Sequence, residues 1–266
     1  MMRMVEIDGD HEQKLIGRAA HELVRNRVDA VWIHGFAKGD VCDAIAGNFR
    51  KSSALLPRKD NVPGLMVGES HYAKTPSAYY ETCRQSCESV DSLFEGTEDP
   101  VRRLYTTVGR HLERKIRAAH FAHGEALHTR AIAWQDRPSS SFLLQPHDDV
   151  SQVFCERNKG WEIVDIRTLL AVNFYASCKA GQGMLRVYDL RHSPELAMQA
   201  KVEGVGYPYP AELLSSTRYT DLAVRTGDLV LLNGAFIHGV TRSQEHRIVL
   251  NSFLGDLRDG ELIYWT

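Results

Sequence analysis

Apolar residues recur every three or four positions in the first half of the chain, which is the period of an amphipathic helix. The helices expected from this period cover residues 11–27, 40–49, 75–94 and 100–116. The last of them has a clear start, because Asp99 is a good N-cap and Pro100 suits the first helical turn. The apolar run 28–33 is expected to be a strand. We therefore expect residues 1–123 to be mainly helical and to support a sheet.

After Gly124 the pattern changes to short apolar runs separated by glycine, proline, asparagine and aspartate. The strands expected from these runs cover residues 126–134, 141–146, 152–155, 161–166, 169–177, 184–188, 228–232, 237–241, 247–254 and 262–265. Many short strands in succession indicate a closed or double-sheet architecture such as the jelly roll. Because helices come first and strands later, the fold class is α+β rather than alternating α/β.

Residues 189–221 interrupt the strand pattern. This stretch contains Pro194, Gly204, Gly206 and the run Tyr-Pro-Tyr-Pro at 207–210. Long insertions of this kind in a compact domain are often lids. We expect it to lie over one end of the barrel.

Composition narrows the class of protein further. The chain has 266 residues, of which 43% are hydrophobic and 25% are charged, as is typical of a globular domain. A formal net charge of −2 gives no electrostatic reason to expect a nucleic acid or an anionic membrane as partner. No apolar run approaches the roughly 20 residues that span a bilayer. Five cysteines without a CxxC pair are typical of a protein with reduced thiols, so we expect a cytoplasmic protein. An oligomer is compatible with the sequence.

Two histidines and a carboxylate stand out among the polar residues. His147 and Asp149 are two positions apart, so on a strand both side chains point to the same face, whereas Asp148 points to the other. His238 follows 91 residues after His147, on another expected strand. Two imidazoles and one carboxylate are the facial triad that holds Fe(II) with open positions. Zinc would also bind these groups, but no HExxH motif is present.

Arg247 follows the second histidine by nine residues and begins the apolar run Ile248-Val249-Leu250. A charge in such a strand is costly unless it is paired. A guanidinium can bind the distal carboxylate of 2-oxoglutarate bidentately. The alternative is an internal salt bridge, with Asp228 or Glu156 as partner.

These residues carry a family resemblance. Residues 124–256 resemble the iron(II)/2-oxoglutarate-dependent dioxygenases with a double-stranded β-helix core, and more narrowly the N-acyl amino-acid hydroxylases and their relatives, the freestanding aliphatic halogenases. The resemblance implies a single dioxygenase domain over 1–266, with a jelly-roll core in 124–266. It also implies that His147, Asp149 and His238 hold Fe(II), that Arg247 anchors 2-oxoglutarate, and that O2 is the co-reactant.

The resemblance implies hydroxylation of an aliphatic C–H bond, with 2-oxoglutarate converted to succinate and CO2. Halogenases of this type have glycine or alanine where Asp149 stands, so the carboxylate favours hydroxylation over chlorination. Alternatives within the same chemistry are desaturation, epimerisation or another oxidative tailoring step of natural-product biosynthesis. A cupin-like metal protein without oxygenase activity and a hydroxylase of a protein target are the remaining alternatives.

The expected substrate is a small molecule, an amino acid or an N-acyl amino acid derivative. Arg84, on the polar helix 75–94, is a candidate for binding its carboxylate, although a solvated helix face is the more common place for such an arginine. Phe253 should face inward on the same side as Arg247 and line an apolar pocket, unless it is only a core residue.

Overall fold

The computed structural model describes residues 2–9, 13–58, 62, 64–134, 136, 140–245 and 247–266, and two β-sheets dominate it. The larger sheet contains, in spatial order, β1 (Met4–Asp8), β2 (Ala30–His34), β13 (Leu229–Asn233), β10 (Ile166–Ser177), β15 (Arg247–Leu257), β8 (Arg130–Trp134), β4 (Gly64–Val67) and β3 (Leu56–Pro57), with β16 (Leu262–Trp265) beside β15 and β5 (Ile116–Ala118) beside β16. The smaller sheet contains β12 (Tyr219–Leu222), β11 (Leu185–Arg191), β14 (Phe236–Thr241) and β9 (Phe142–His147). A hairpin of β6 (His120–Phe121) and β7 (Gly124–Glu125) lies apart from both sheets.

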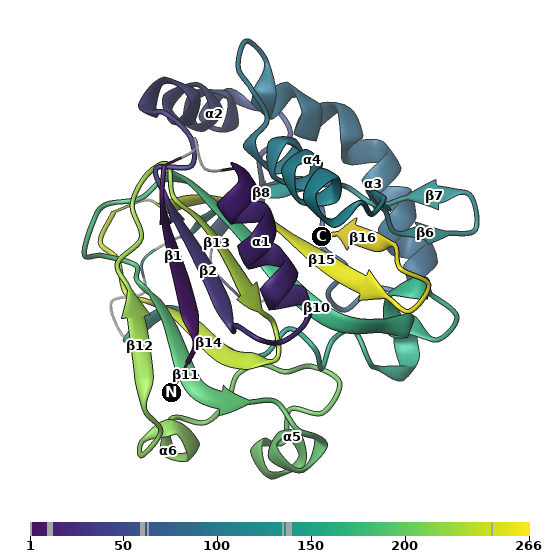
Figure 1. The fold of residues 1–266 in the computed structure, drawn as a ribbon, viewed down its shortest axis with the longest axis vertical. Coiled ribbons are helices and arrows are strands. Elements are labelled where there is room, and N and C mark those ends of the chain that lie inside the picture. The colour runs from purple at the N-terminus through teal and green to yellow at the C-terminus, as the bar shows by residue number, and fades with distance from the viewer. Residues whose placement is uncertain are drawn as a thin grey trace.

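The two sheets face each other across a shared core, as in a jelly roll. Side chains of both sheets, among them Ala171 and Val249 from the larger and Val187 and Val240 from the smaller, belong to one hydrophobic cluster. Figure 1 shows β11 and β14 lying across the strands of the larger sheet. This arrangement confirms the expected mixed architecture of helices and strands. In such a double sheet, every second side chain of a strand points into the space between the sheets.

The central strands bury both of their faces. On β10, Leu170, Val172 and Phe174 belong to the cluster beneath the helices. The alternate residues Asn173 and Tyr175 line a cavity between the sheets. Because successive side chains of a strand point to opposite faces, one strand serves a dry core and a functional pocket together.

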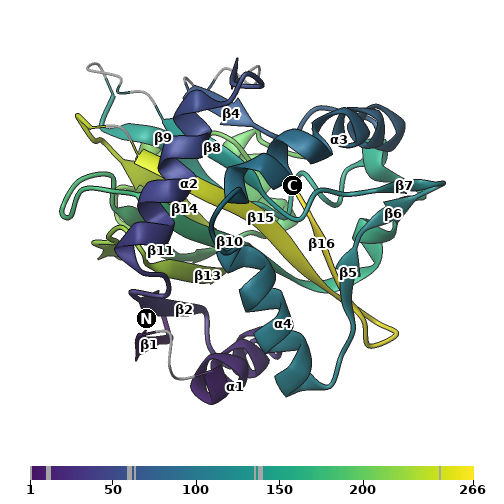
Figure 2. The same ribbon diagram turned by 90° about the horizontal axis from the view of Figure 1, so that it is seen from above.

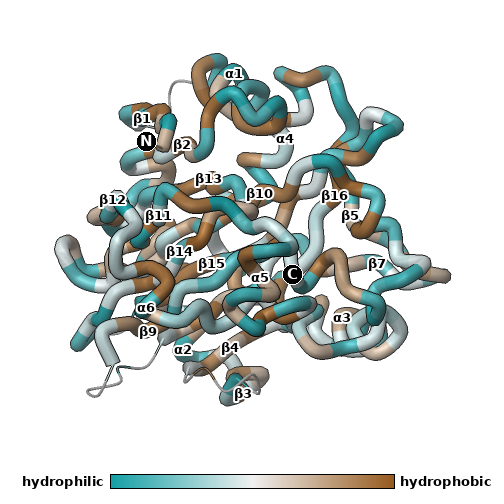
Figure 3. Tube along the Cα trace, turned by 90° about the horizontal axis from the view of Figure 1, so that it is seen from below, coloured by the Kyte–Doolittle hydropathy of each residue, from teal (hydrophilic) through white to brown (hydrophobic). Residues whose placement is uncertain are grey.

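Three helices, α1 (Gln13–Val24), α2 (Gly39–Lys51) and α4 (Pro100–Leu112), cover the outer face of the larger sheet (Figures 1 and 2). The Asp99 carboxylate accepts hydrogen bonds from the backbone N–H groups of Val101 and Arg102, which confirms the predicted N-cap of α4. A fourth helix, α3 (Pro76–Asp91), is continued by the 3-10 turn η1 (Ser92–Phe94). Along the chain trace, apolar stretches concentrate on the strands and alternate with polar ones on the helices (Figure 3).

Several sequence predictions need correction. Residues 152–155 and 161–165 are not strands, because the chain there forms turns and the 3-10 helices η2 (Glu156–Asn158) and η3 (Glu162–Asp165), and only Ile166 of the predicted strand 161–166 belongs to a strand, as the first residue of β10. The buried Asn158 side chain donates to the carbonyls of Gln152 and Val153, which holds the chain in a turn. The N-terminal half contributes β1, β3, β4, β5 and β6 as well as helices, and the predicted helix start at His11 lies outside the described residues.

The predicted insertion at 189–221 contains two short helices, α5 (Pro194–Ala200) and α6 (Ala211–Leu214), before β12. They lie at the opposite end of the molecule from α2 (Figure 1). A small apolar cluster of its own, which includes Tyr209 and Leu214, packs this segment against Ile237 of β14. Within the described part of the chain, no helix combines the length and apolar character needed to cross a membrane.

Candidate metal centre and its pocket

The pairing of β9 with β14 brings the two predicted histidines together. His147, the last residue of β9, lies directly opposite His238 in the antiparallel register, and their ring centroids are 4.2 Å apart. Asp149 follows two residues later, and its backbone N–H donates to the carbonyl of Gly234 in the turn before β14. One ligand atom from each of the three buried residues lies within 4.8 Å of the others. The three residues that the sequence predicted to form a triad therefore meet at one point.

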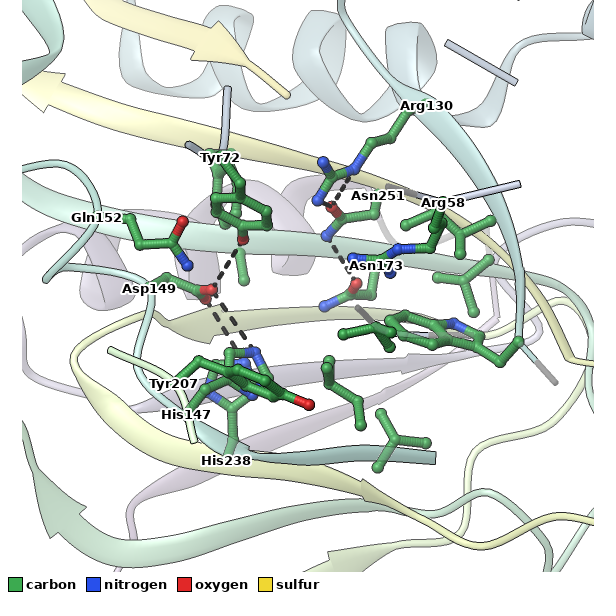
Figure 4. Close-up of a pocket in the computed structure, with 18 of the residues that line it drawn as sticks. Arg58, Tyr72, Arg130, His147, Asp149, Gln152, Asn173, Tyr207, His238 and Asn251 are labelled. Carbon is green, nitrogen blue, oxygen red and sulfur yellow. Dashed lines mark hydrogen bonds and ion pairs between the residues drawn. The ribbon is translucent and has the colours of Figure 1, made fainter. Parts of the chain in front are cut away.

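Both imidazoles are oriented by the backbone. His147 Nδ1 lies 2.9 Å from the carbonyl oxygen of Gln145, and His238 Nδ1 lies 2.9 Å from that of Phe236. A carbonyl only accepts, so Nδ1 of each ring carries a proton, and in the neutral imidazole Nε2 is the nitrogen that offers a lone pair. The Nε2 atoms face Asp149, at 3.8 Å from Oδ1 for His147 and 3.5 Å from Oδ2 for His238 (Figure 4). Backbone-fixed tautomers of this kind are typical of metal-binding histidines.

The Asp149 carboxylate lacks the partners that a buried anion needs. The Tyr72 hydroxyl lies 3.5 Å from Oδ1, and Oδ2 has no hydrogen-bond partner among the described residues. Burial raises the pKa of Asp149 to about 6 and lowers the pKa of His147 to about 3. A divalent cation would bind the neutral imidazoles and compensate the carboxylate, so this donor set fits Fe(II).

Asp148 points away from the triad, as expected. Its fully buried carboxylate accepts hydrogen bonds from the backbone N–H and hydroxyl of Ser151, at 2.7 and 2.9 Å, and from the Tyr209 hydroxyl at 2.9 Å. Burial opposes ionisation, but contacts from His192 and Ser151 outweigh it and lower the pKa of Asp148. Its backbone N–H also donates to the carbonyl of Gly206. Asp148 therefore fastens the segment 189–221 to the loop that carries Asp149.

A cavity of about 320 Å³ opens from the triad between the two sheets. Apolar side chains line much of it, and most of its charged side chains are positive. Four arginines and a single carboxylate, Asp149, are the ionised groups among the described lining residues; the arginines are Arg58, Arg130, Arg157 and Arg247. The cavity therefore suits a ligand that carries negative charge.

Arg247 lies at the cavity wall. It is buried at the start of β15, its Cζ is 4.8 Å from the centre of the Tyr175 ring, and its Nε has no hydrogen-bond partner among the described residues. The Tyr175 hydroxyl is likewise buried without a partner there, and burial raises the pKa of Tyr175 to about 12, so it remains an O–H donor. The alternative of a salt bridge to Asp228 or Glu156 finds no support in the described ion pairs, and Asp228 instead accepts from Trp32, Gly35 and Arg225.

The two residues predicted to bind substrate have different positions. Phe253 lines the cavity. Arg84 does not, because it lies on the exposed face of α3, where Nη2 is 2.8 Å from Oε1 of Glu81. Arg130 and Asn173 also line the cavity and were not predicted from the sequence. The signal that could have found them is a polar residue at an inward position of an otherwise apolar strand.

Comparisons with known proteins agree with this architecture. The model of the family described as carrier-protein-independent halogenase WelO5 matches residues 1–266. The L-isoleucine 3(1)-dioxygenase of Pantoea ananatis is 29% identical over 245 residues, which cover 88% of this chain and 82% of that protein.

Solved structures show the same fold. The N-substituted L-amino acid dioxygenase of Burkholderia ambifaria is 18% identical with a TM-score of 0.64, over 94% of this chain and 91% of that one. The α-ketoglutarate-dependent epimerase SnoN of nogalamycin biosynthesis is 11% identical with a TM-score of 0.51, over 90% of this chain and 81% of that one. These likenesses confirm the expected jelly-roll fold.

Proposed function

We propose that this chain hydroxylates an aliphatic C–H bond of an amino acid or an N-substituted amino acid. The chain belongs to the family of the carrier-protein-independent halogenase WelO5 and is an Fe(II)/2-oxoglutarate-dependent dioxygenase. The observation that carries the proposal is the complete ligand set of two histidines and one aspartate at the wall of a cationic cavity. The family assignment argues against the alternative of a cupin-like metal protein without oxygenase activity.

His147, Asp149 and His238 would hold the metal, and Arg247 with the Tyr175 hydroxyl would hold the distal carboxylate of 2-oxoglutarate. When bound, Fe(II) and 2-oxoglutarate supply oxygen activation coupled to the release of succinate and CO2. The chain's own part is to present two Nε2 lone pairs and one carboxylate on the same side, to keep the opposite side open to the cavity, and to hold both organic ligands in place.

The retained carboxylate supports hydroxylation rather than halogenation. Asp149 occupies a ligand position that would have to be empty for a halide to bind beside the histidines. Gly234 shapes the same corner, because a Cβ atom there would lie 2.1 Å from Leu169 Cδ2 and 3.1 Å from Asp149 Cβ. A side chain at position 234 would therefore displace Leu169 or Asp149.

The substrate class rests on charge and on the relatives. One relative is named for L-isoleucine and one for N-substituted L-amino acids, and both kinds of molecule combine a carboxylate with aliphatic carbon. The cavity offers buried arginine beside apolar walls that include Phe253. Segment 189–221 is the proposed lid, because Gly204, Val205 and Tyr207 line the same cavity. All five cysteines are free thiols, which supports a cytoplasmic location.

Anaerobic reconstitution tests the proposal. Fe(II) and 2-oxoglutarate are added to the metal-free protein, and the weak visible charge-transfer band of the chelate is recorded for wild type and His238→Ala. The reconstituted enzyme then receives O2 with a panel of free and N-acylated aliphatic amino acids, and succinate and products that are heavier by one oxygen are measured. A band in wild type alone, with one succinate for each hydroxylated product, is the expected result. A product lighter by two hydrogens would instead establish desaturation, and no coupled product from any member would overturn the substrate class.

A further inference from the structure

A row of polar side chains crosses the larger sheet inside the cavity. Arg130 of β8 pairs in register with Asn251 of β15, which pairs in turn with Asn173 of β10. Arg130 Nε and Nη2 donate to Asn251 Oδ1 at 3.1 and 2.8 Å, and Asn251 Nδ2 donates to Asn173 Oδ1 at 3.0 Å (Figure 4). Each bond fixes the orientation of the next amide, so the guanidinium is held rigidly before any ligand arrives.

Arg130 carries a buried charge without an anion. It is 2% exposed, and no carboxylate lies within ion-pair distance of it among the described residues. Its Nη1 is buried and has no hydrogen-bond partner in that part of the chain. Asn251 is neutral, and the Tyr72 ring lies beside the guanidinium, with its centre 5.1 Å from Cζ. An unpaired buried guanidinium is costly, and a carboxylate brought by a ligand would offset that cost.

Arg130 and Arg247 mark two separate ends of the cavity. Arg130 pairs with Asn251, four residues beyond Arg247 on the same strand, so the backbone positions of the two arginines lie about 13 Å apart along the strand direction at about 3.3 Å per residue. 2-Oxoglutarate has four carbon–carbon bonds of about 1.5 Å and spans about 5 Å between its carboxyl carbons. A cosubstrate that reaches from the triad to Arg247 therefore leaves Arg130 for another ligand.

We infer that Arg130, held in place by Asn251, binds the α-carboxylate of the amino-acid substrate, an inference that rests on the proposed function. Tyr72 connects Arg130 with the triad, because its hydroxyl is 3.5 Å from Asp149 Oδ1 and its ring lies against the Arg130 guanidinium. Phe253 packs beside Tyr72, with ring centroids 6.2 Å apart. A substrate whose carboxylate lies on Arg130 would extend its carbon chain along these two rings toward the triad.

The test measures binding without turnover. Protein loaded with Zn(II) in place of Fe(II), and with 2-oxoglutarate, is titrated with L-isoleucine and with L-isoleucinamide in a calorimeter. Wild type is expected to prefer the carboxylate. Arg130→Gln should weaken L-isoleucine binding by about 10- to 100-fold, the value of a charged hydrogen bond, and should leave the already weak binding of the amide unchanged. Arg130→Lys should lie between the two, and Arg84→Gln, on the exposed face of α3, is the matched control.

Each other outcome has a distinct meaning. If Arg130→Gln loses affinity for 2-oxoglutarate and keeps that for L-isoleucine, Arg130 belongs to the cosubstrate site and the inference is wrong. If the variant binds both ligands as wild type does, Arg130 has a structural role only. Wild type that forms the Fe(II) chelate but binds no amino acid would overturn the proposed substrate class, and this inference with it. Unchanged 2-oxoglutarate binding by the Arg130 variants shows that they are folded.

Discussion

At the scale of single residues, Asp149 sets function against stability. Its carboxylate is buried and Oδ2 has no hydrogen-bond partner among the described residues, so the metal-free protein pays for an anion that only a cation compensates. The pKa of Asp149, raised by burial to about 6, corresponds to a cost of up to about 3 kcal/mol for the ionised form. The cost is full above pH 6 and fades as the pH falls toward 4, because there the folded state binds the extra proton.

Asp149→Asn is therefore expected to stabilise the metal-free protein and to disable the enzyme. Denaturant unfolding at pH 7.5 should show a gain of about 1–3 kcal/mol for the metal-free variant, because the neutral amide carries no charge to bury. Addition of Fe(II) under argon should raise the stability of wild type and leave the variant unchanged. A metal-free variant that is less stable than wild type would show that the carboxylate is compensated without the metal.

A second buried group predicts acid sensitivity. His71 is surrounded by the rings of Tyr72, Tyr79, Phe253 and Trp265. Burial lowers the pKa of His71 to about 3. The unfolded chain binds a proton at this residue below a pKa of about 6.5 and the folded one does not, so stability is lost as the pH falls from about 6.5 toward 3.

His71→Gln removes this titration. At pH 5.0 the wild-type protein should have lost about 2 kcal/mol relative to pH 7.5 through His71 alone, and the variant should be spared that loss. The measurement is the free energy of unfolding of both proteins at the two pH values, so that other titrating groups cancel in the comparison. Equal losses in the two proteins would place the acid-sensitive group elsewhere.

A site residue could be predicted where the residues that identify it lie close together in the sequence. His147 and Asp149 could be predicted because two ligand types at a spacing of two occupy one face of a strand. Arg130 was missed and Arg84 chosen instead, because a sequence does not reveal which arginine a fold buries. Arg130 is buried by Tyr72 and Asn251, which lie 58 and 121 residues away from it in the chain.

At the scale of elements, strands were predicted well where the two faces have different partners. β10, β13 and β15 carry continuous apolar runs because one face packs against the helices and the other packs into the core between the two sheets. The prediction failed at 152–155, where β-type residues are held in a turn by the side chain of Asn158, and at 161–165, where the chain forms the 3-10 helix η3. A single buried amide outweighs strand propensity, which is a weak and context-dependent preference.

The tether of segment 189–221 gives a prediction for this scale. Tyr209→Phe keeps the ring in its apolar cluster but removes the hydrogen bond to the Asp148 carboxylate, which is worth about 1.5–3 kcal/mol. Hydrogen exchange should become faster within 194–214, with metal binding retained. Tyr219→Phe is the matched control, since this residue is 51% exposed. Unchanged exchange in the Tyr209 variant would show that the segment is held without Asp148.

At the scale of the whole molecule, the part that sequence could not supply is the pairing of distant segments. The smaller sheet joins β9 to β14, 89 residues from one strand end to the other, and the larger sheet places β2 beside β13 across an even longer stretch. Local periodicity does not determine such partners. The helical layer was nevertheless expected in the correct half of the chain, because amphipathic spacing is a local property.

The last prediction concerns the charge balance of the whole cavity. Four arginines face one carboxylate, so binding the dianion 2-oxoglutarate should stabilise the metal-loaded protein, by about 2.7 kcal/mol at a concentration of 100 times Kd. Arg247→Gln, which removes the charge beside Tyr175, should weaken 2-oxoglutarate binding by about 10- to 100-fold.

At the same ligand concentration, the stabilisation of Arg247→Gln should then fall to as little as about 0.4 kcal/mol. Thermal unfolding of Zn(II)-loaded wild type, Arg247→Gln and Arg130→Gln, each with and without 2-oxoglutarate, separates the two arginines. Arg247→Gln should lose the ligand-dependent shift and Arg130→Gln should keep it, because only one of the two cations lies at the cosubstrate end. The reverse pattern would exchange the roles of the two ends of the cavity, and a loss in both variants would mean that 2-oxoglutarate depends on the summed charge rather than on one contact.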